Sequence, residues 1–444
     1  MAMTRSRTRP TFDWRRVFRT SSVLTIACTG AGMIGKRGAI MEHIETVIVG
    51  GGQAGLSLSY YLTGKDSGHV ILERGDIGQG WADRWDEFCL VTPNWSVRLP
   101  GFPYQGSDPD GFMPRDDVVA HLTGYAESFD APVRTGVEVT SCEKADQGFV
   151  VHTGAGDIAC KNLVMANGAY QKPFLPKGAK TLPDSLPQLT LGDYKNADAL
   201  PKGKILIVGS GQSGAQISEE LAMARRSVTL ACGRVGWAQR RYGDKDIVWW
   251  AERAGFYEHR LADLPEGARL AGMVLISGHH GGAHSINFET LQDQGVELVG
   301  RFMGCQGQIA RFADDLEASN QFSNDRFNDI RNLFTATAEK IGEPVPEFCG
   351  ETKLKGTPRT EIGLADYGAV LFTGGFRPGY DSLLPIGDAF DEHGFPFQTD
   401  GKSDVVPGLW FLGTHFLRTR GSSLLLGVGK DAEVVARALT GTPT

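Results

Sequence analysis

Two glycine-rich loops constrain the fold of this 444-residue chain more than any other feature. The first loop lies in VIVGGGQAG (residues 47–55) and the second in ILIVGSGQSG (205–214). Each follows a short run rich in β-branched residues and precedes a helical pattern, with a second strand pattern further on. This order of strand, G-x-G-x-x-G loop, helix and strand is typical of a dinucleotide-binding βαβ unit.

In the first loop, each glycine has a predicted role. Gly50 permits the tight turn, Gly52 lets the backbone approach a pyrophosphate, and Gly55 lets the helix pack closely on the strand. The N–H groups at the start of the helix would face the phosphates. The second strand pattern, in HVILER (69–74), brings Glu73 to its end, and this carboxylate can accept hydrogen bonds from an adenosine ribose.

The second loop repeats the spacing with Gly209, Gly211 and Gly214, but no carboxylate ends its second strand. Arg234 stands there instead. A guanidinium suits a ribose 2′-phosphate, which a carboxylate would repel, so NADP(H) is favoured over NAD(H). The alternative, in which Arg234 is an ordinary solvated charge, stays open.

Two such sites in one chain predict two cofactors, FAD as a resident redox carrier and NADP(H) as its hydride donor. We expect an α/β fold with two Rossmann-like domains, a three-layer FAD/NAD(P)-binding fold in which the NADPH domain is inserted in the FAD domain. The predicted boundaries are residues 41–200 and 356–444 for the FAD domain and 201–355 for the NADPH domain. The arginine-rich residues 1–40 are predicted to be a non-structural leader or a mis-assigned start, with an export signal as the alternative.

Composition excludes several other classes of function. A net charge of −7 argues against nucleic acid as a partner, and the seven cysteines form no C-x-x-C pair. We therefore expect a reducing, cytoplasmic location and no dithiol centre. No apolar run approaches the ~20 residues of a membrane span, so we expect no stable membrane insertion. His279, His280 and His284 lie in a glycine-rich stretch without a nearby acid or cysteine, so we expect no metal site.

Four further segments resemble the flavin-containing monooxygenase superfamily, which includes indole-3-pyruvate monooxygenases and uncharacterised bacterial FAD/NAD(P)-binding oxidoreductases. They are GQGWADRWD (78–86), LVMANGAY (163–170), LFTGGFRP (371–378) and the C-terminal GLWFLGTHFLRTRGSSLLLGVGKDAEVVARAL (408–439). The resemblance covers roughly residues 44–440.

The resemblance implies that Trp81 and Arg84 lie beside the FAD. It also implies that a C-terminal helix beginning at Gly421 or Ser422 points its N-terminus at the flavin ring. The sequence departs from the superfamily pattern before the second glycine loop, where Thr190 stands in place of a histidine although Tyr194 is kept. Whether this chain can oxygenate a substrate as the superfamily does depends on whether that histidine takes part in the reaction or only supports the fold.

The predicted site residues fall into three groups. The flavin group is Gly50, Gly52, Gln53, Ala54, Gly55, Glu73, Arg74, Gly80, Trp81, Arg84, Thr92, Val137, Asn167, Gly168, Gly413 and Leu425. The nicotinamide nucleotide group is Gly209, Gly211, Gln212, Ser213, Gly214, Arg234, Thr373 and Gly374. The catalytic candidates are Asn94, for a polar contact to a peroxide or the nicotinamide, and His415, for a flavin or substrate contact. An ordinary loop role for His415 is the alternative.

The resemblance and the two nucleotide sites together predict an NADPH-using, FAD-dependent monooxygenase. It would insert one oxygen of O2 into a small organic substrate through a flavin C4a-(hydro)peroxide, by N- or S-oxygenation or oxidative decarboxylation. The alternatives are a flavoprotein reductase or dehydrogenase that passes electrons to a quinone or another acceptor, and a slow redox sensor. A homodimer is compatible with the sequence.

Overall fold

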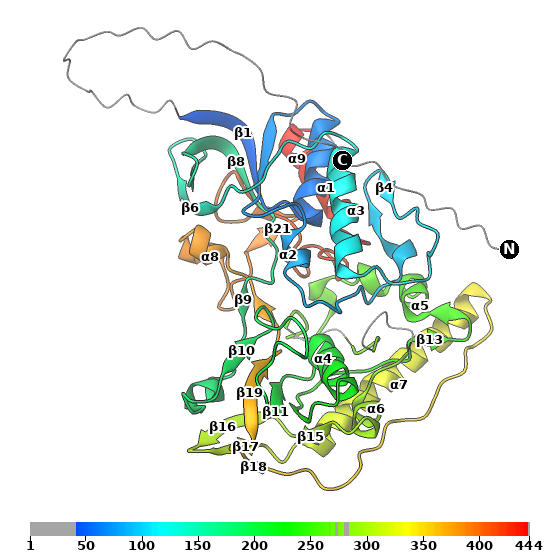
Figure 1. Cartoon of the computed structure of the whole chain (residues 1–444). Coiled ribbons are helices and arrows are strands. Elements are labelled where there is room, and N and C mark those ends of the chain that lie inside the picture. The colour runs from blue at the N-terminus through cyan, green and yellow to red at the C-terminus, as the bar shows by residue number, and fades with distance from the viewer. Residues whose placement is uncertain (1–40, 266, 271–273, 279–283, 443–444) are drawn as a thin grey trace, which may run out of the picture. The chain divides into compact units, whose positions relative to one another are not determined.

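The computed structural model describes residues 41–265, 267–270, 274–278 and 284–442, and residues 41–444 form one compact unit (Figure 1). The predicted leader, residues 1–40, lies outside the described residues, as do His279 and His280 of the histidine-containing stretch. No helix in the described part of the chain is long and apolar enough to cross a membrane. Within the same residues, no group of three or more histidine, cysteine or acidic side chains is arranged to hold a metal ion.

A nine-stranded sheet is built around the first glycine loop. Its main path runs β21-β22-β23-β8-β1-β2-β5, and β7 pairs with β8 and then with β6. Strands β2 and β8 flank β1, and both pair with it in parallel. Further out, β5 pairs in parallel with β2, and β23 pairs in parallel with β8. The bounds are β1 Glu42–Val49, β2 His69–Leu72, β5 Val133–Arg134, β6 Val139–Lys144, β7 Phe149–Thr153, β8 Ile158–Met165, β21 Gln398–Thr399, β22 Lys402–Ser403 and β23 Leu409–Phe411.

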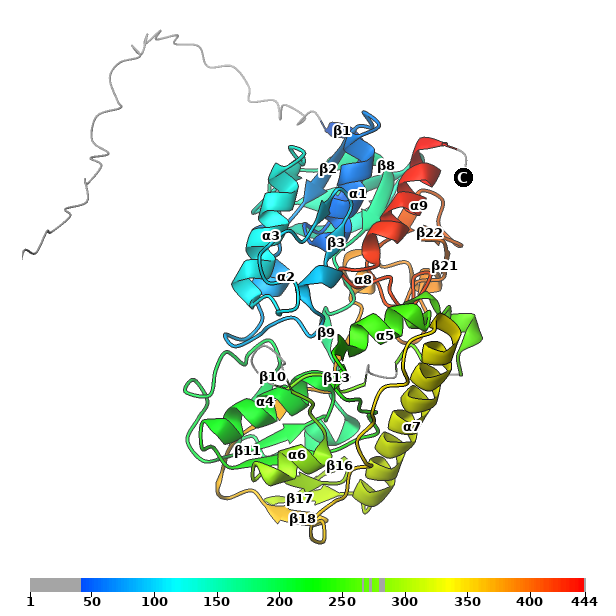
Figure 2. The same ribbon diagram turned by 90° about the vertical axis from the view of Figure 1, so that its right-hand side faces the viewer.

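Three helices lie together against this sheet (Figure 2). They are α1 Gln53–Thr63, α3 Arg115–Glu127 and α9 Val428–Thr440. The central strand and α1 are buried because β1 is bordered by strands on both edges and α1 is covered by α9 and α3. The strand and helix predicted around the first loop are confirmed.

A second sheet of five parallel strands is built around the second glycine loop, in the order β10-β19-β11-β12-β15. Its bounds are β10 Gln188–Thr190, β11 Lys204–Val208, β12 Val228–Ala231, β15 Glu297–Val299 and β19 Tyr367–Phe372. Helices α4 Gln212–Met223 and α6 Phe288–Asp293 pack together beside it. Two of its strands, β10 and β19, come from outside the range 201–355 in which the sequence places the insertion.

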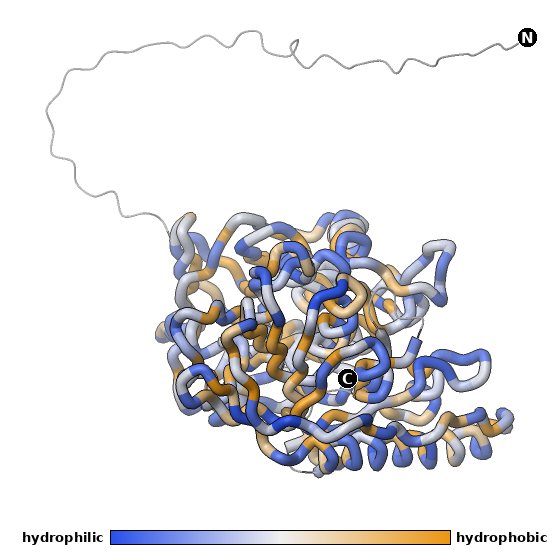
Figure 3. The backbone as a smooth tube through the Cα atoms, turned by 60° about the horizontal axis from the view of Figure 1, so that its bottom comes forward, coloured by the Kyte–Doolittle hydropathy of each residue, from blue (hydrophilic) through white to orange (hydrophobic). Residues whose placement is uncertain are grey.

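The remaining elements are short or peripheral. Helix α7 ends at Gly342, which has a left-handed conformation, φ +74°. In Figure 3, hydrophobic residues (orange) are concentrated in the interior of the molecule, and hydrophilic residues (blue) in many of the outer loops. The other bounds are α2 Gln79–Ala82, α5 Ile247–Arg253, α7 Leu316–Ile341, α8 Tyr380–Leu383, β3 Arg98–Leu99, β4 Phe102–Pro103, β9 Lys172–Pro173, β13 Arg241–Tyr242, β14 Lys245–Asp246, β16 Phe302–Gln306, β17 Ile309–Phe312, β18 Glu361–Gly363 and β20 Phe376–Arg377, with 3₁₀ turns η1 Asn94–Ser96, η2 Lys177–Thr181, η3 Phe256–Glu258, η4 Leu261–Asp263 and η5 Gly387–Ala389.

The predicted start of the C-terminal helix is wrong. The sequence places it at Gly421 or Ser422, but α9 begins at Val428, after a series of turns. In these turns the N–H of Gly427 donates to the carbonyl of Leu424, and a side chain on Gly427 would collide with the backbone of Gly421. The chain folds back on itself there, so residues 421–427 cannot continue the helix.

Candidate functional site

The three glycines of the first loop meet three different surroundings. Gly50 has φ +112°, and a β-carbon there would lie 2.7 Å from the carbonyl oxygen of Ala166, at the end of β8. A β-carbon on Gly55 would overlap the carbonyl oxygen of Gly50, whereas one on Gly52 would have nothing within 4 Å. The fold therefore explains Gly50 and Gly55, and it leaves the space over Gly52 open for something outside the chain.

The second loop has the same pattern. Gly209 has φ +119°, and its β-carbon would lie 2.8 Å from the amide nitrogen of Gly374 after β19. A β-carbon on Gly214 would overlap the carbonyl oxygen of Gly209, and one on Gly211 would again have nothing within 4 Å. Both middle glycines thus border an open space that a side chain would fill.

Helices α1 and α4 begin directly after Gly52 and Gly211. Neither helix has a side-chain cap, and neither has an acidic residue in its first turn. The N–H groups of a helix start need acceptors, and together with the helix dipole they favour an anion. Each loop therefore fits a pyrophosphate, with the close approach made over the middle glycine.

Glu73 lies where the fingerprint predicts, at the end of β2 and beside the first loop. Its buried carboxylate accepts hydrogen bonds from the N–H of Gly51 at 2.7 Å and of Gly75 at 3.0 Å. The carbonyl of Glu73 accepts from the N–H of Val137 at 2.9 Å, so Val137 also lies at this edge. Arg74 is exposed, 4.0 Å from Asp83.

Trp81 is connected to the first loop through a side chain. Its indole Nε1 donates to Oε1 of Gln53 at 3.0 Å, and the amide of Gln53 donates to the carbonyl of Ser423 at 3.4 Å. Gly413, with φ +74°, packs so closely on α1 that its β-carbon would lie 2.6 Å from that of Ala54. The structure thus brings these predicted flavin residues, from α1, α2 and the end of β23, to one place.

Other predicted flavin residues lie around this place. A β-carbon on Gly80 or on Gly168 would meet nothing within 4 Å, so the space beside both is open. Thr92 is half-buried in the loop before η1. Leu425 is a buried core residue whose carbonyl accepts a hydrogen bond from the N–H of Arg98 at 3.3 Å.

At the second loop, the Gln212 side chain holds a neighbouring segment of backbone. Its amide donates to the carbonyl of Ser277 at 2.6 Å and accepts from the N–H of Ile276 at 3.0 Å. Ser213 is half-buried in the first turn of α4. The hydroxyl of Thr373 donates to the carbonyl of Gly209 at 2.7 Å, which ties the end of β19 to the loop.

Arg234 is exposed and follows the end of β12, the strand next to the glycine loop. The carbon of its guanidinium lies 6.0 Å from the centre of the Phe322 ring. This is the position in a βαβ unit at which the ribose of a bound dinucleotide is recognised.

A short ribbon places the two glycine loops opposite each other. Strand β9, which follows β8, pairs antiparallel with β20, which follows β19. The carboxyl ends of β8 and β19 therefore point toward each other, and each glycine loop lies at the carboxyl end of the neighbouring strand, β1 or β11. In open parallel sheets, ligands bind outside the carboxyl ends of the strands. The region beside the ribbon is where ligands of the two loops would meet.

Arg84 lies beside this ribbon among aromatic rings. The carbon of its guanidinium is 5.3 Å from the ring centre of Tyr170, 5.9 Å from that of Phe376 and 6.0 Å from that of Phe88. Its Nε is buried and has no hydrogen-bond partner among the described residues. Burial disfavours the charged form and lowers the pKa of Arg84.

His415 is paired with Tyr170. The Tyr170 hydroxyl and Nε2 of His415 share a hydrogen bond of 2.9 Å, and the two rings meet edge to face. Burial, and secondly the charge of Arg269, lower the pKa of His415 to about 4. The imidazole is therefore neutral near pH 7. The side-chain oxygen of Asn167, close by in the chain, is buried without a partner in the described structure.

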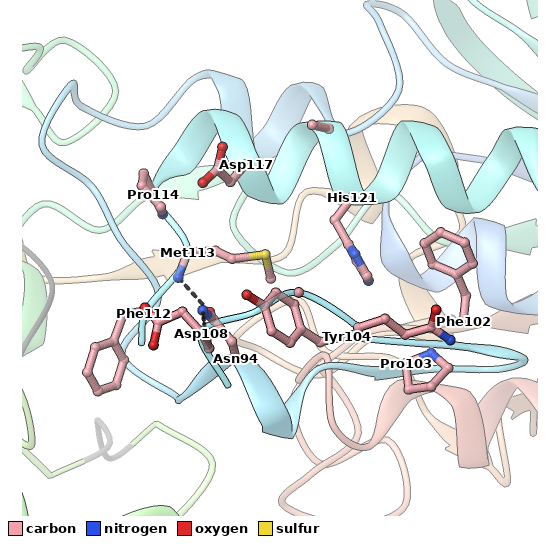
Figure 4. A pocket seen from close by; sticks show the side chains of 13 residues that line it. Asn94, Phe102, Pro103, Tyr104, Asp108, Phe112, Met113, Pro114, Asp117 and His121 are labelled. Carbon is pink, nitrogen blue, oxygen red and sulfur yellow. Dashed lines mark hydrogen bonds between the residues drawn. The ribbon is translucent and has the colours of Figure 1, made fainter. Parts of the chain in front are cut away.

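Asn94, the other catalytic candidate, holds its own loop in place. Its amide donates to the carbonyl of Asp108 at 2.9 Å, and its oxygen accepts from the N–H of Met113 at 2.7 Å. It borders a pocket of about 500 Å³ between this loop and α3 (Figure 4), in which the Tyr104 hydroxyl and the His121 ring point inward. Both polar ends of Asn94 are occupied, so its predicted contact with a ligand would require these bonds to open.

Reasoning from the sequence missed the residues of the ribbon and one buried ion pair. Tyr170 stands inside a quoted motif but was given no role, and the pairing of β9 with β20 leaves no local signal. Arg240, which is fully buried, pairs with Asp246 at 2.5 Å and donates to the carbonyl of Val91 at 2.7 Å. It thereby joins the segment before α5 to the loop that contains Asn94.

Comparison with known proteins agrees with this geometry. The pyridine nucleotide-disulphide oxidoreductase family matches residues 47–250. An uncharacterised CzcO-like oxidoreductase of Geobacillus kaustophilus is 30% identical over 407 residues, which cover 88% of this chain and 97% of the relative. The rice indole-3-pyruvate monooxygenase YUCCA4 is 30% identical over 203 residues, 41% of this chain and 46% of the plant enzyme.

Two solved structures share the fold. The flavin-containing monooxygenase from Stenotrophomonas maltophilia superposes with a TM-score of 0.63 at 20% identity, covering 90% of this chain and 99% of that one. OTEMO, solved in complex with FAD and NADP, superposes with a TM-score of 0.52 at 14% identity, covering 90% of this chain and 85% of that one. The mixed α/β fold predicted from the sequence is confirmed.

Proposed function

Because this chain belongs to the CzcO-like oxidoreductase family, within the flavin monooxygenase-like superfamily, we propose that it is an FAD-dependent, NADPH-using monooxygenase of small organic substrates. One observation carries the proposal. The chain has two glycine loops, each with an open space over its middle glycine, and the β9–β20 ribbon turns the two loops toward each other. A flavin held by one loop and a nicotinamide held by the other would meet beside the ribbon.

We assign FAD to the first loop and NADPH to the second. Glu73 has a carboxylate at the ribose position of the first loop, and Arg234 has a guanidinium at the corresponding position of the second. The proposed insertion carries the second sheet, so we place its ends at the ribbon, before β10 and after β19.

When bound, the flavin would take hydride from NADPH and react with O2, and the chain would position and shield these groups. The rings of Phe88, Tyr170 and Phe376 surround the Arg84 guanidinium beside the ribbon. His415 is neutral near pH 7 and hydrogen-bonded to Tyr170, so it supplies no proton to this region. Oxygen chemistry in this region would require that stray protons be kept out.

Isotope incorporation tests the proposal. The purified protein is loaded with FAD and given NADPH, ¹⁸O-labelled O2 and a panel of amines, sulfides and 2-oxo acids. Incorporation of one labelled oxygen per NADPH consumed is the expected result. Rapid NADPH oxidation with a quinone and no labelled product would instead support a reductase, and protein that binds neither nucleotide would refute the proposal.

A further inference from the structure

A second connection, apart from the β9–β20 ribbon, runs between the surroundings of the two glycine loops. It begins at Gln212 of the second loop, whose side chain holds the backbone of residues 276–277. The carbonyl of the adjacent Leu275 accepts a hydrogen bond from the N–H of Ala238 at 2.9 Å. Arg240 follows Ala238 closely in the chain, so its backbone is fixed relative to the second loop.

The other end of this connection lies beside the first loop. Gln53 stands at the same position of the glycine motif as Gln212, and it accepts a hydrogen bond from the Trp81 indole at 3.0 Å. The ring centre of Trp81 lies 5.8 Å from that of Phe88. Val91 follows Phe88 closely in the chain. The segment that contains Val91 therefore borders the place where the predicted flavin residues gather.

The Arg240 side chain joins these two ends. Its guanidinium donates to the carbonyl of Val91 at 2.7 Å and pairs with Asp246, the N-cap of α5, at 2.5 Å. The carbon of the guanidinium also lies 4.4 Å from the centre of the Phe112 ring. Arg240 is only 1% exposed. A single buried side chain thus holds together the part of the chain around the second loop and the Val91 segment beside the first.

Stability by itself gives little reason to bury this guanidinium. Removing two charges from water costs free energy that their attraction repays only in part, and apolar side chains of similar volume often stabilise a fold as well. An apolar side chain cannot, however, bind a carbonyl and a carboxylate in fixed directions, as the planar fork of an arginine does. The particular contribution of Arg240 is therefore the geometry of the segments that it joins.

We infer that Arg240 is a positioning residue for hydride transfer, because it holds the Val91 segment of the flavin site in register with the part of the chain that binds NADPH. This inference rests on the proposed function and adds to it a residue outside both glycine loops. A hydride, with its pair of electrons, leaves NADPH as NADP+ and reduces the flavin. The reacting atoms must lie about 3–3.5 Å apart, and a displacement of about 1 Å can cost about 100-fold in rate.

Anaerobic stopped-flow reduction of the FAD-loaded protein by NADPH tests the inference, since it separates the limiting rate from the Kd. In the double variant Arg240→Met with Asp246→Asn, which leaves no unpaired charge, we expect the limiting rate to fall at least about 10-fold and the Kd to change by about 2-fold or less. Arg240→Lys keeps the charge but not the planar fork, so its limiting rate should lie between those of the double variant and the natural protein. Arg98→Met is the matched control, because it removes an exposed ion pair with Glu252 of α5 and should keep the natural rate.

An absorbance spectrum reports the contact of the two rings without turnover. Protein that has been reduced with dithionite is mixed with NADP+, and stacked flavin and nicotinamide rings then give a long-wavelength charge-transfer band. We expect this band in the natural protein and in Arg98→Met. The double variant should show a clearly weaker band, while its FAD content and its Kd for NADP+ stay unchanged.

Several outcomes would overturn the inference. An unchanged limiting rate and an unchanged band in the folded double variant would assign Arg240 to stability alone. Loss of FAD, or a raised Kd for NADPH at an unchanged limiting rate, would assign it to cofactor binding. If the double variant does not fold, Arg240→Lys decides by the same two measurements.

Failure of the proposed function would be distinguishable from failure of the inference. It would appear as absence of labelled product while the limiting rate and the charge-transfer band still depend on Arg240. A natural protein that shows neither reduction by NADPH nor the band would overturn both.

Discussion

The carbonyl oxygen of Gly50 occupies the space that a β-carbon on Gly55 would need. Gly50 and Gly55 lie in the backbone of one tight strand-to-helix turn, so the carbonyl of Gly50 cannot move aside for a side chain on Gly55. Over Gly52, two residues after the first glycine, there is nothing within 4 Å. The fold therefore requires glycine at positions 50 and 55, whereas only a ligand would require it at position 52.

This difference predicts opposite effects of two valine substitutions. Gly52→Val should abolish FAD binding and the yellow colour, while the unfolding free energy of the apoprotein changes by about 1 kcal/mol or less. Gly55→Val, the matched control, should destabilise the apoprotein by about 3 kcal/mol or more because backbone must shift. Flavin absorbance and urea unfolding of the apoproteins measure both effects, and a yellow Gly52→Val protein would contradict the assignment.

Arg234 should determine the choice of nucleotide. Arg234→Ala removes the proposed partner of the 2′-phosphate, so the KM for NADPH should rise by about 10- to 100-fold while that for NADH changes by about 2-fold or less. Steady-state flavin reduction with each nucleotide measures the two constants. Equal changes for both nucleotides would remove the preference for NADP(H).

His415 should make stability depend on pH. Its pKa falls from the ordinary 6.5 to about 4 in the folded chain, so the unfolded chain binds more protons between these values. The contribution of neutral His415 to the unfolding free energy is fully present above about pH 6.5 and is lost as the pH falls toward about 4. Between about pH 7 and about pH 4 the natural protein should lose about 3 kcal/mol more than His415→Gln, as measured by urea unfolding.

The control for this experiment is His393→Gln. His393 is half-buried, and its Nε2 lies 3.6 Å from Oε1 of Glu392. Its replacement gives the reference for a histidine-to-glutamine substitution elsewhere on the chain. If His415→Gln shows the same slope as His393→Gln, the imidazole of His415 is not held neutral by the fold.

Breaking the buried ion pair between Arg240 and Asp246 should lower the unfolding free energy strongly, and a second substitution should restore part of it. Arg240→Met leaves the Asp246 carboxylate buried and unpaired, which should cost about 3–5 kcal/mol. Adding Asp246→Asn removes that charge and keeps an acceptor for the N–H of Val248 at the start of α5, so at least about half of the loss should return.

An exposed pair calibrates the measurement. Arg98 and Glu252 lie 2.8 Å apart at the surface, and Arg98→Met should cost about 1 kcal/mol or less. Urea unfolding of the four proteins gives the comparison. A double variant no more stable than Arg240→Met alone would show that the loss comes from packing and not from an unpaired charge.

The sequence by itself determined the local units of this protein. A strand, three spaced glycines and a helix specify each loop because positive φ and the absence of a β-carbon are properties of single residues and their immediate neighbours. The same reasoning placed Glu73 and Arg234 at the ends of the second strands. It failed at the C-terminal helix, where a helical pattern from residue 421 is overridden by the fold-back of Gly421 on Gly427.

Only the tertiary structure decided what lies between the two loops. Strand β10 joins the second sheet from outside the predicted insertion, and β9 pairs with β20 through hydrogen bonds between segments distant in the chain. The position of Arg84 against Tyr170 and Phe376 follows from that pairing. No periodicity or spacing records such contacts, because they depend on the summed packing of both sheets and not on the preferences of neighbouring residues.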